Sequence, residues 1–374
     1  MKGIAITSKG LEETASLEIK ELIGAECKIE YSCVIFDFDK FEDLCMLCYK
    51  AQSVDRVLHL IGNFEFEKFE EIDGFIDKLS LGEWLKKYNK FKVECVRIGS
   101  HGFKSVDIEK KFIALAKKKY KNAKFDLKGH EIIFFVFIAE NLCYFGIDFA
   151  GFELNKRAYK IYLHPSSLRG TIAYALAMES GFKKNEVLLD PFSRDGIIPI
   201  EAAHYANDFP VNYFKKDRFA FLKLDLGIDY EKFFKIADKM ALKKPKSKIY
   251  SFDHLFKYVD FSKKNAKIAG LEKSIEFSRT EIEWLDIKFK KESVDRIVTN
   301  LPTSKNANLD KIYNEFFYQS EYILKKDGAI GIITRMPDFV KRHAEKHNFT
   351  VTKENDVFSG EQPLKIILLK KKNI

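Results

Sequence analysis

From residue 165 onward, short apolar runs alternate with segments in which apolar positions recur at helical spacing. An apolar run of about four to eight residues is typical of a buried strand, and strands that alternate with helices predict a parallel sheet with crossover connections. The seven expected strands are 186–190, 248–253, 274–278, 294–299, 329–334, 348–353 and 364–370. The second part of the chain is therefore expected to form a doubly wound α/β domain.

The first 60 residues show a different order, in which strands and helices are mixed over short distances. Strands are expected at 3–7, 33–38 and 55–61, and helices at 11–22 and 41–51. This order predicts a small α+β module of the ferredoxin-like type.

A second α+β module is expected over residues 61–150. Its elements are a lysine-rich helix around 109–119 and strands at 91–98, 131–139 and 142–149. Arg97 lies near the end of the first strand, and Lys104 lies in the turn that follows it. A cationic turn before a basic helix predicts an edge that faces phosphate, although an ordinary loop also fits this pattern. Arg97 and Lys104 are therefore candidate RNA contacts.

Composition favours a folded chain of two or three domains. The chain has 374 residues, 46% of them hydrophobic, and its 64 Lys and Arg against 55 Asp and Glu give a net charge of +9. This charge favours a polyanionic partner, but ordinary solvated lysines explain it equally well. The sequence shows no signal peptide and no stretch of about 20 uncharged apolar residues that could span a bilayer. We expect a soluble, cytoplasmic monomer that binds no membrane.

All six cysteines lie in the first half of the chain. Cys45 and Cys48 form a CxxC pair within an apolar run, and no second pair stands at zinc spacing. We expect buried structural thiols and no metal site.

The first chemical motif follows the strand 186–190. Asp190-Pro191-Phe192-Ser193-Arg194-Asp195-Gly196 is a tight turn that leads into an apolar helical segment. In a doubly wound domain such a turn presents a nucleotide-like cofactor to backbone amides at a helix N-terminus. A glycine at 196 permits a positive φ or a close backbone approach.

A second motif, Asn300-Leu301-Pro302-Thr303, follows the strand 294–299. In order and spacing, the two motifs resemble the cofactor loop and the catalytic loop of amino-methyltransferases that use S-adenosylmethionine (SAM). The segments 61–150, 151–160 and 164–173 resemble the THUMP domain, the linker and the opening of the catalytic domain in THUMP-domain tRNA (guanine-N2)-methyltransferases. The chain therefore resembles this family along its whole length.

The resemblance implies an organisation in four segments: an N-terminal ferredoxin-like module at 1–60, a THUMP RNA-binding domain at 61–150, a linker at 151–164 and a Rossmann-like methyltransferase domain at 165–374. It implies SAM as the cofactor and tRNA as the partner. Lys156 and Arg157 in the linker are then expected to lie near phosphate. A polar, aromatic-bearing insertion at 205–246 is expected on the cofactor side.

The resemblance also assigns cofactor contacts in the turn at 190–196. The family pattern Asp-Pro-aromatic-x-Gly-x-Gly is matched by Asp190, Phe192 and Gly196, whereas Arg194 stands in place of the first glycine. Arg194 could crowd the methionine end of SAM or distort the turn. It could instead pair with the SAM carboxylate, which needs a cationic or amide partner.

Two further acids are assigned to the adenosine end of the cofactor. Asp253 ends the strand 248–253 at the position of the family's ribose-binding acid, where a carboxylate can accept from both ribose hydroxyls. An acid that caps the next helix is the alternative interpretation of Asp253. Glu281 falls where the family places an acid near the adenine amino group.

The second motif implies catalysis at an exocyclic amine, whose lone pair is delocalised into the base. The Asn300 side-chain oxygen and a backbone carbonyl made rigid by Pro302 would accept the hydrogens of that amine and orient it. Thr303 replaces the family's stacking aromatic, which leaves Tyr313, Phe316 or Phe317 as candidates for this role. An ordinary strand-to-loop turn is the alternative for the same residues.

Three hypotheses follow from these observations. The first is a SAM-dependent RNA methyltransferase that modifies the N2 amine of a guanosine in tRNA. The second is a THUMP-containing tRNA-binding protein whose catalytic site is degenerate, since Arg194 and Thr303 depart from the motifs. The third, DNA adenine methylation, would leave the THUMP-like segment without a role.

Overall fold

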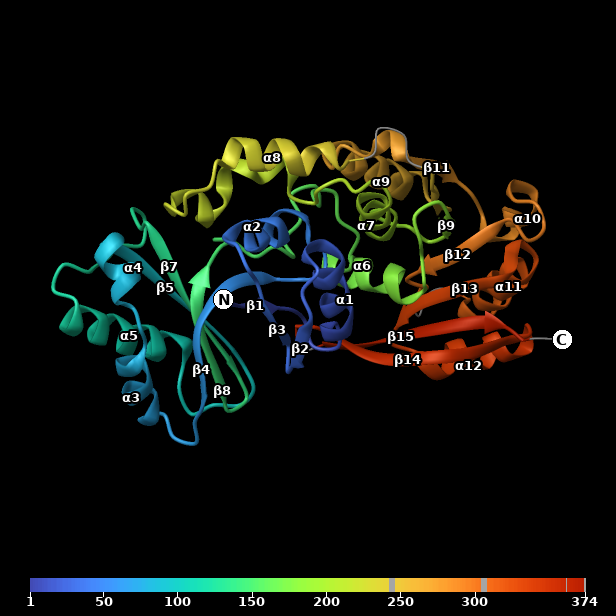
Figure 1. The fold of residues 1–374 in the computed structure, drawn as a ribbon. Helices are drawn as coiled ribbons and strands as arrows, with labels where there is room; N and C mark the ends of the chain where they lie inside the picture. The colour runs from blue at the N-terminus through green and yellow to red at the C-terminus, as the bar shows by residue number, and fades with distance from the viewer. Residues whose placement is uncertain (242–245, 304–307, 361, 373–374) are drawn as a thin grey trace. The chain divides into compact units, whose positions relative to one another are not determined.

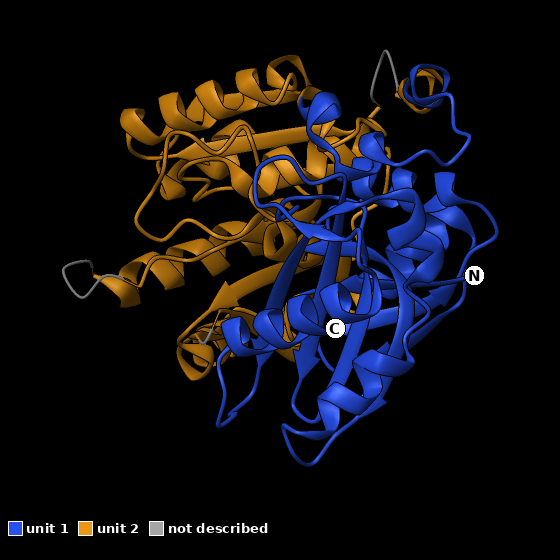
Figure 2. Cartoon of the chain, turned by 90° about the vertical axis from the view of Figure 1, so that its left-hand side faces the viewer, with its two compact units in different colours: residues 1–7, 15–154, 215–234 blue, residues 8–14, 155–214, 235–374 orange. Residues whose placement is uncertain are grey.

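The computed structural model describes residues 1–241, 246–303, 308–360 and 362–372 (Figure 1). The chain divides into two compact units, each made of segments that are distant in sequence (Figure 2). Unit 1 contains residues 1–7, 15–154 and 215–234, and unit 2 contains residues 8–14, 155–214 and 235–374. No helix of the described residues is both long and apolar enough to cross a membrane.

Unit 1 is built on an eight-stranded sheet with the order β2-β3-β1-β4-β8-β7-β5-β6. Its strands are β1 (Lys2–Ile6), β2 (Cys27–Glu30), β3 (Cys33–Asp37), β4 (Arg56–Glu65), β5 (Lys90–Ile98), β6 (Lys124–Phe125), β7 (Ile132–Ala139) and β8 (Leu142–Asp148). The helices are α1 (Glu12–Ile23), whose first residues belong to unit 2, α2 (Phe41–Lys50), α3 (Glu71–Lys78), α4 (Gly82–Lys87) and α5 (Ser105–Lys119). The expected mixed α+β order is confirmed, and α3 and α4 are additions that the sequence pattern did not indicate.

Strand β4 joins the two α+β modules expected from the sequence. Leu58 on β4 pairs with Ile4 on one side and with Asp148 on the other, so one continuous sheet runs through both modules. The expected boundary at residue 60 falls inside this strand. Cys45 and Cys48 lie on α2 and are fully buried, as expected, and burial raises the pKa of both thiols.

Part of the expected insertion at 205–246 belongs to unit 1. This region holds the short turns η1 (Tyr213–Arg218) and η2 (Ala220–Lys223) and the helix α8 (Tyr230–Lys239), while residues 242–245 lie outside the described residues. The rings of Phe219 and Phe234 lie 6.3 and 5.0 Å from that of Tyr49. Residues 215–234 therefore pack by their aromatic side chains within unit 1, and the position of the insertion on the cofactor side stays a prediction.

Unit 2 is built on a seven-stranded sheet with the order β11-β10-β9-β12-β13-β15-β14. Its strands are β9 (Val187–Asp190), β10 (Lys248–Asp253), β11 (Ile275–Arg279), β12 (Val294–Thr299), β13 (Leu324–Thr334), β14 (Phe349–Ser359) and β15 (Gln362–Lys371). The helices are α6 (Gly170–Glu179), α7 (Ile197–Ala206), α9 (Phe256–Ile268), α10 (Leu285–Lys288), α11 (Leu309–Ile323) and α12 (Pro337–Lys346). The short turns η3 (Glu272–Ser274) and η4 (Ile282–Trp284) flank β11.

All seven expected strands of unit 2 are confirmed, and the Rossmann-like α/β class with them. Strands β9 to β13 are parallel, and β15 runs antiparallel to both of its neighbours. Leu188 and Leu189 on β9 belong to different cores, because successive side chains of a strand point to opposite faces. Helices α6, α7 and α9 contribute to the first core and α10, α11 and α12 to the second.

The strand order reverses at β9, since the chain passes from β9 outward to β11 and then returns to β12 on the other side. In open α/β sheets, ligands bind beyond the carboxyl ends of the strands at such a switch point. The two sequence motifs follow β9 and β12, so they meet at this place.

Candidate cofactor and catalytic site

The turn after β9 has the backbone geometry that its glycine predicts. Gly196 has φ +79° and stands at the N-cap of α7, which confirms the expected positive φ. A Cβ at this position would clash with the Ser262 hydroxyl of α9. The close approach at Gly196 is therefore made by a protein side chain.

Asp190 lies beneath the turn, where it connects two strand ends. Its Oδ1 accepts hydrogen bonds from the Thr299 hydroxyl at 2.6 Å and from the Phe192 amide at 3.2 Å. Burial raises the pKa of Asp190 to about 7. Because its carboxyl group is buried and does not line the cavity described next, we revise its role from a cofactor contact to a support that holds β9 and β12 together.

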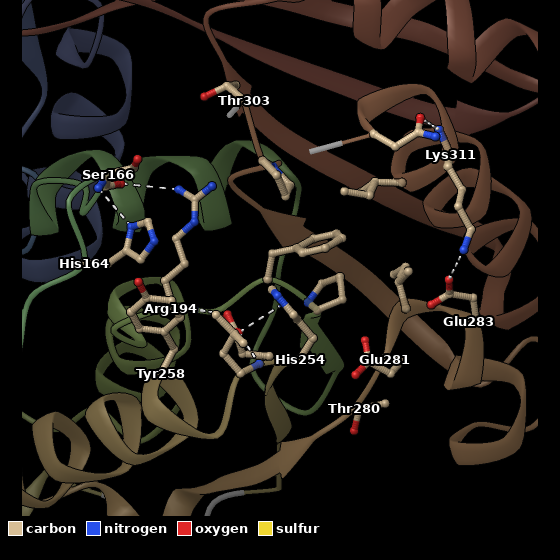
Figure 3. Close-up of a pocket in the computed structure, with 18 residues that line it drawn as sticks. His164, Ser166, Arg194, His254, Tyr258, Thr280, Glu281, Glu283, Thr303 and Lys311 are labelled. Carbon is tan, nitrogen blue, oxygen red and sulfur yellow. Dashed lines mark hydrogen bonds and ion pairs between the residues drawn. The ribbon is translucent and has the colours of Figure 1, made fainter. Parts of the chain in front are cut away.

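A cavity of about 640 Å³ opens over the carboxyl ends of β9 to β12 (Figure 3). Five of the residues assigned from the sequence line it, namely Phe192, Arg194, Asp253, Glu281 and Pro302. The other lining residues are His164, Ser166, Pro191, His254, Leu255, Tyr258, Thr280, Ile282, Glu283, Thr303, Asn308, Lys311 and Ile312. A volume between about 300 and 1,000 Å³ with apolar walls and a few polar groups is typical of a site for a small molecule or cofactor.

Asp253 lies at the end of β10 and is 2% exposed. Its Oδ2 accepts from the Arg194 amide at 3.1 Å, and its Oδ1 accepts from the Leu255 amide at 2.9 Å, just before α9. Burial raises the pKa of Asp253. The second bond matches the capping alternative, but a carboxylate has about four acceptor positions and keeps capacity for a ligand.

His164 and Tyr258 contribute a wall of the cavity that the sequence did not assign. Their rings lie 4.6 Å apart in an edge contact. Burial, together with the positive charges of Arg194 and Lys257, lowers the pKa of His164 to about 4, so the imidazole is neutral at neutral pH. In the sequence, the run His164-Pro165-Ser166 marks the start of the domain just before α6. This position is the feature that could have indicated His164 as a residue of the site.

Arg194 connects the turn at 190–196, called the cofactor turn below, to the loop at 300–303, called the catalytic loop below. Its backbone adopts φ +52°, the left-handed conformation that suits the glycine it replaces. Its guanidinium donates from Nη2 to the Leu301 carbonyl at 3.2 Å and from Nη1 to the Ser166 carbonyl at 3.4 Å. Burial lowers the pKa of Arg194, and the nearby Asp190 and Asp253 oppose this shift. The turn therefore accommodates Arg194.

The catalytic loop lies at the edge of the same cavity. Pro302 lines it, and the Asn300 Nδ2 donates to the Ser166 carbonyl at 3.3 Å. The Tyr313 hydroxyl donates to the Pro302 carbonyl at 3.0 Å. The structure thus places Asn300 and Pro302 beside the cofactor turn.

The candidates for a replacement stacking residue are wrong. Tyr313, Phe316 and Phe317 are fully buried on the face of α11 that packs against the sheet. None of their rings can receive a base without unfolding this core. Thr303 is exposed at the cavity.

The expectation that Arg157 lies near phosphate is also wrong. Its Nε and Nη2 donate to the two carboxylate oxygens of Glu201 on α7, at 2.7 and 3.0 Å, and both side chains are fully buried. The Tyr159 hydroxyl donates to the same carboxylate. Lys156 is exposed and stays a candidate RNA contact.

The two candidates in unit 1 lie on either side of the turn after β5. Arg97 donates from Nε to the Ser105 hydroxyl at 3.3 Å, and its guanidinium lies 5.3 Å from the Phe103 ring centroid. Lys104 is exposed and precedes α5. Their contact with RNA stays a prediction.

Comparison with known families agrees with this site. A family model described as "RMKL-like, methyltransferase domain" matches residues 157–364, which is more than half of the chain. The chain belongs to the RMKL-like methyltransferase family. A THUMP domain model matches residues 66–148 in addition. The family match spans the cofactor turn, the cavity and the catalytic loop.

Relatives of this family member match it almost from end to end. The chain is 29% identical over 366 residues to a tRNA (guanine(6)-N2)-methyltransferase of Methanocaldococcus jannaschii, which covers 94% of this chain and 95% of that relative. It is 25% identical over 379 residues to the enzyme of the same name in Archaeoglobus fulgidus, with 97% and 91% covered.

Solved structures show that the fold is shared. SMU.472 complexed with S-adenosylhomocysteine (SAH) superposes with a TM-score of 0.82 at 20% identity, over 100% of this chain and 98% of that one. TrmN from Thermus thermophilus superposes with a TM-score of 0.73 at 20% identity, over 99% of both chains.

Proposed function

We propose that this family member is a SAM-dependent tRNA methyltransferase that modifies the exocyclic N2 amine of a guanosine, with guanosine 6 as the position to test first. The observation that carries the proposal is that Asp253 and Pro302 line one cavity, with Asn300 at its edge. The similarity to the tRNA (guanine(6)-N2)-methyltransferases of Methanocaldococcus jannaschii and Archaeoglobus fulgidus supports the choice of substrate.

The cavity residues fit the parts of SAM. Asp253 offers acceptor capacity for ribose hydroxyls, and Leu255 and Ile282 offer apolar surface for a purine. The guanidinium of Arg194 is a suitable partner for a carboxylate. When bound, SAM supplies a methyl group on a positively charged sulfur.

Asn300 and Leu301 then orient the amine. The Asn300 Nδ2 is held by the Ser166 carbonyl, which leaves its Oδ1 to accept one amine hydrogen. The Leu301 carbonyl, made rigid by Pro302, would accept the other hydrogen, and the two acceptors together would orient the nitrogen of the amine. SAM would supply its methyl group to this nitrogen and leave as SAH, and the amine would release one proton to solvent.

The alternative of a degenerate tRNA-binding protein rests on Arg194 and Thr303. Arg194 adopts the backbone conformation of the missing glycine, and a cavity of about 640 Å³ is present beside it. Both observations favour the enzyme. Lys104, Lys156 and Arg97 are our proposed tRNA contacts.

The test uses labelled SAM and two tRNA transcripts that differ by a single amino group. One carries guanosine at position 6 and the other carries inosine, which lacks the 2-amine. We expect methylation of the first transcript alone, and loss of SAM binding by titration calorimetry in Asp253→Ala. A folded protein that binds tRNA but not SAM would instead be the degenerate tRNA-binding protein.

A further inference from the structure

The guanidinium of Arg194 is buried at the cavity without an acidic partner. The residue is 8% exposed, and its two donor contacts are the backbone carbonyls of Leu301 and Ser166. Among the described residues, no carboxylate oxygen lies within 4.0 Å of it. Neutral carbonyls do not neutralise the charge of a buried cation, so the part of the cavity beside Arg194 is suited to an anion.

Among the described residues, the neighbouring acids accept hydrogen bonds from other groups and none from the guanidinium of Arg194. Both oxygens of Asp253 accept backbone amides, and Asp190 is bonded to Thr299 and Phe192. Asp195 accepts from the His164 amide at 3.4 Å. An anion that pairs with Arg194 must therefore come from a ligand.

Arg194 also binds an atom that the proposed reaction requires. The Leu301 carbonyl is the backbone acceptor for the amine, and among the described residues Arg194 is its donor. The next carbonyl of the loop, that of Pro302, accepts from Tyr313. A guanidinium at Leu301 weakens this oxygen as an acceptor and places positive charge where the attacking amine itself becomes positive.

We propose that Arg194 couples the two binding events: the carboxylate of the cofactor draws the guanidinium away from Leu301, and the target guanine binds productively only afterwards. This inference rests on the proposed function and concerns the regulation of that site. A charged acceptor replaces a neutral one, and a guanidinium can form two parallel N–H···O bonds to a carboxylate, which a single carbonyl cannot accept. Because coupling is reciprocal, the guanosine must also tighten cofactor binding by the same factor.

The experiment compares SAH with 5′-methylthioadenosine, which keeps the adenosine and sulfur but lacks the carboxylate. Affinity for the guanosine-6 transcript is measured by fluorescence anisotropy with each compound at saturation. In the wild-type protein we expect SAH to tighten tRNA binding by about fivefold or more, within the usual range of coupling, and methylthioadenosine to have no effect. The inosine-6 transcript lacks the amine and should show no effect of SAH.

Two variants test the residue itself. Arg194→Gly suits the positive φ, and Arg194→Met keeps most of the side-chain length without the charge. In both we expect tRNA binding to be independent of SAH, SAH affinity to fall toward that of methylthioadenosine, and methylthioadenosine affinity to stay within about twofold of wild type. The exposed Arg335→Met is the matched control and should behave as wild type.

The outcomes separate this inference from the proposed function. Equal effects of SAH and methylthioadenosine on wild-type tRNA affinity, or coupling that persists in Arg194→Gly, would overturn the role of Arg194 alone. A folded wild-type protein that binds neither compound would overturn the proposed function, and the inference with it.

Discussion

The Arg157 guanidinium and the Glu201 carboxylate form a doubly hydrogen-bonded ion pair inside unit 2, with distances of 2.7 and 3.0 Å. The pair connects the segment before α6 to helix α7, whose N-terminus carries the cofactor turn. A salt bridge that is fully buried is sensitive to the loss of one partner, because the remaining charge is left unpaired.

Arg157→Met is therefore expected to lower the free energy of unfolding by about 3–5 kcal/mol. Urea unfolding followed through Trp284 in a Trp84→Phe background reports on unit 2. The control is Arg342→Met, whose exposed pair with Asp310 at 3.4 Å should contribute at most about 1 kcal/mol. Similar losses in the two variants would contradict the buried role of Arg157.

The buried Asp190 predicts a pH-dependent stability. Its pKa is about 7 in the folded protein against an ordinary value of 3.8, so the folded state holds the proton more tightly. This proton stabilises the folded state fully at pH values below the ordinary pKa, and the stabilisation is lost as the pH rises through about 7. Between pH 3.8 and about 7, the free energy of unfolding of Asp190→Asn should therefore rise relative to that of wild type. The expected gain is a few kcal/mol, since one pKa unit corresponds to about 1.4 kcal/mol.

The comparison is made by urea unfolding of both proteins at pH 5 and pH 8, two values inside and above that interval. Asp338→Asn is the control, since the Asp338 side chain is 99% exposed and should show no such trend. A constant difference between wild type and Asp190→Asn at both pH values would refute the assignment.

Asn300 is expected to act on the reaction more than on cofactor binding. Removal of one preorganised polar group from a transition state costs about 100-fold to 1,000-fold in kcat. Asn300→Ala should show such a loss with SAH affinity within about twofold of wild type, because Asn300 itself does not line the cavity and its side chain donates to the Ser166 carbonyl. Asn300→Asp keeps an acceptor oxygen and should recover part of the rate. A large loss of SAH affinity in Asn300→Ala would show that its role is structural.

Lys104 and Lys156 are expected to contact phosphate, since both are exposed. Each change to Ala should weaken tRNA binding and reduce the slope of log K against log salt concentration by about 1. The control is Arg157→Met under conditions in which it is folded, where the slope should be unchanged. An unchanged slope for both lysine variants would place the tRNA elsewhere.

The sequence alone predicted the seven strands of unit 2 along the chain and the two motifs that follow β9 and β12. The strands could be predicted because an apolar run between turn residues is a local signal. The two motifs follow β9 and β12 directly. Asp253 and Pro302 line the cavity because strand ends in a parallel sheet meet at one edge. These inferences needed only neighbours in sequence.

Only the tertiary structure decided the surroundings of Arg157, Asp190 and Arg194. Arg157 finds its partner at Glu201, and Arg194 finds the Leu301 carbonyl, over separations of 44 and 107 residues. The wall formed by His164 and Tyr258 likewise joins two distant segments. A charged residue has the same local signal whether it faces solvent or the interior, because its burial depends on which chain segments pack over it.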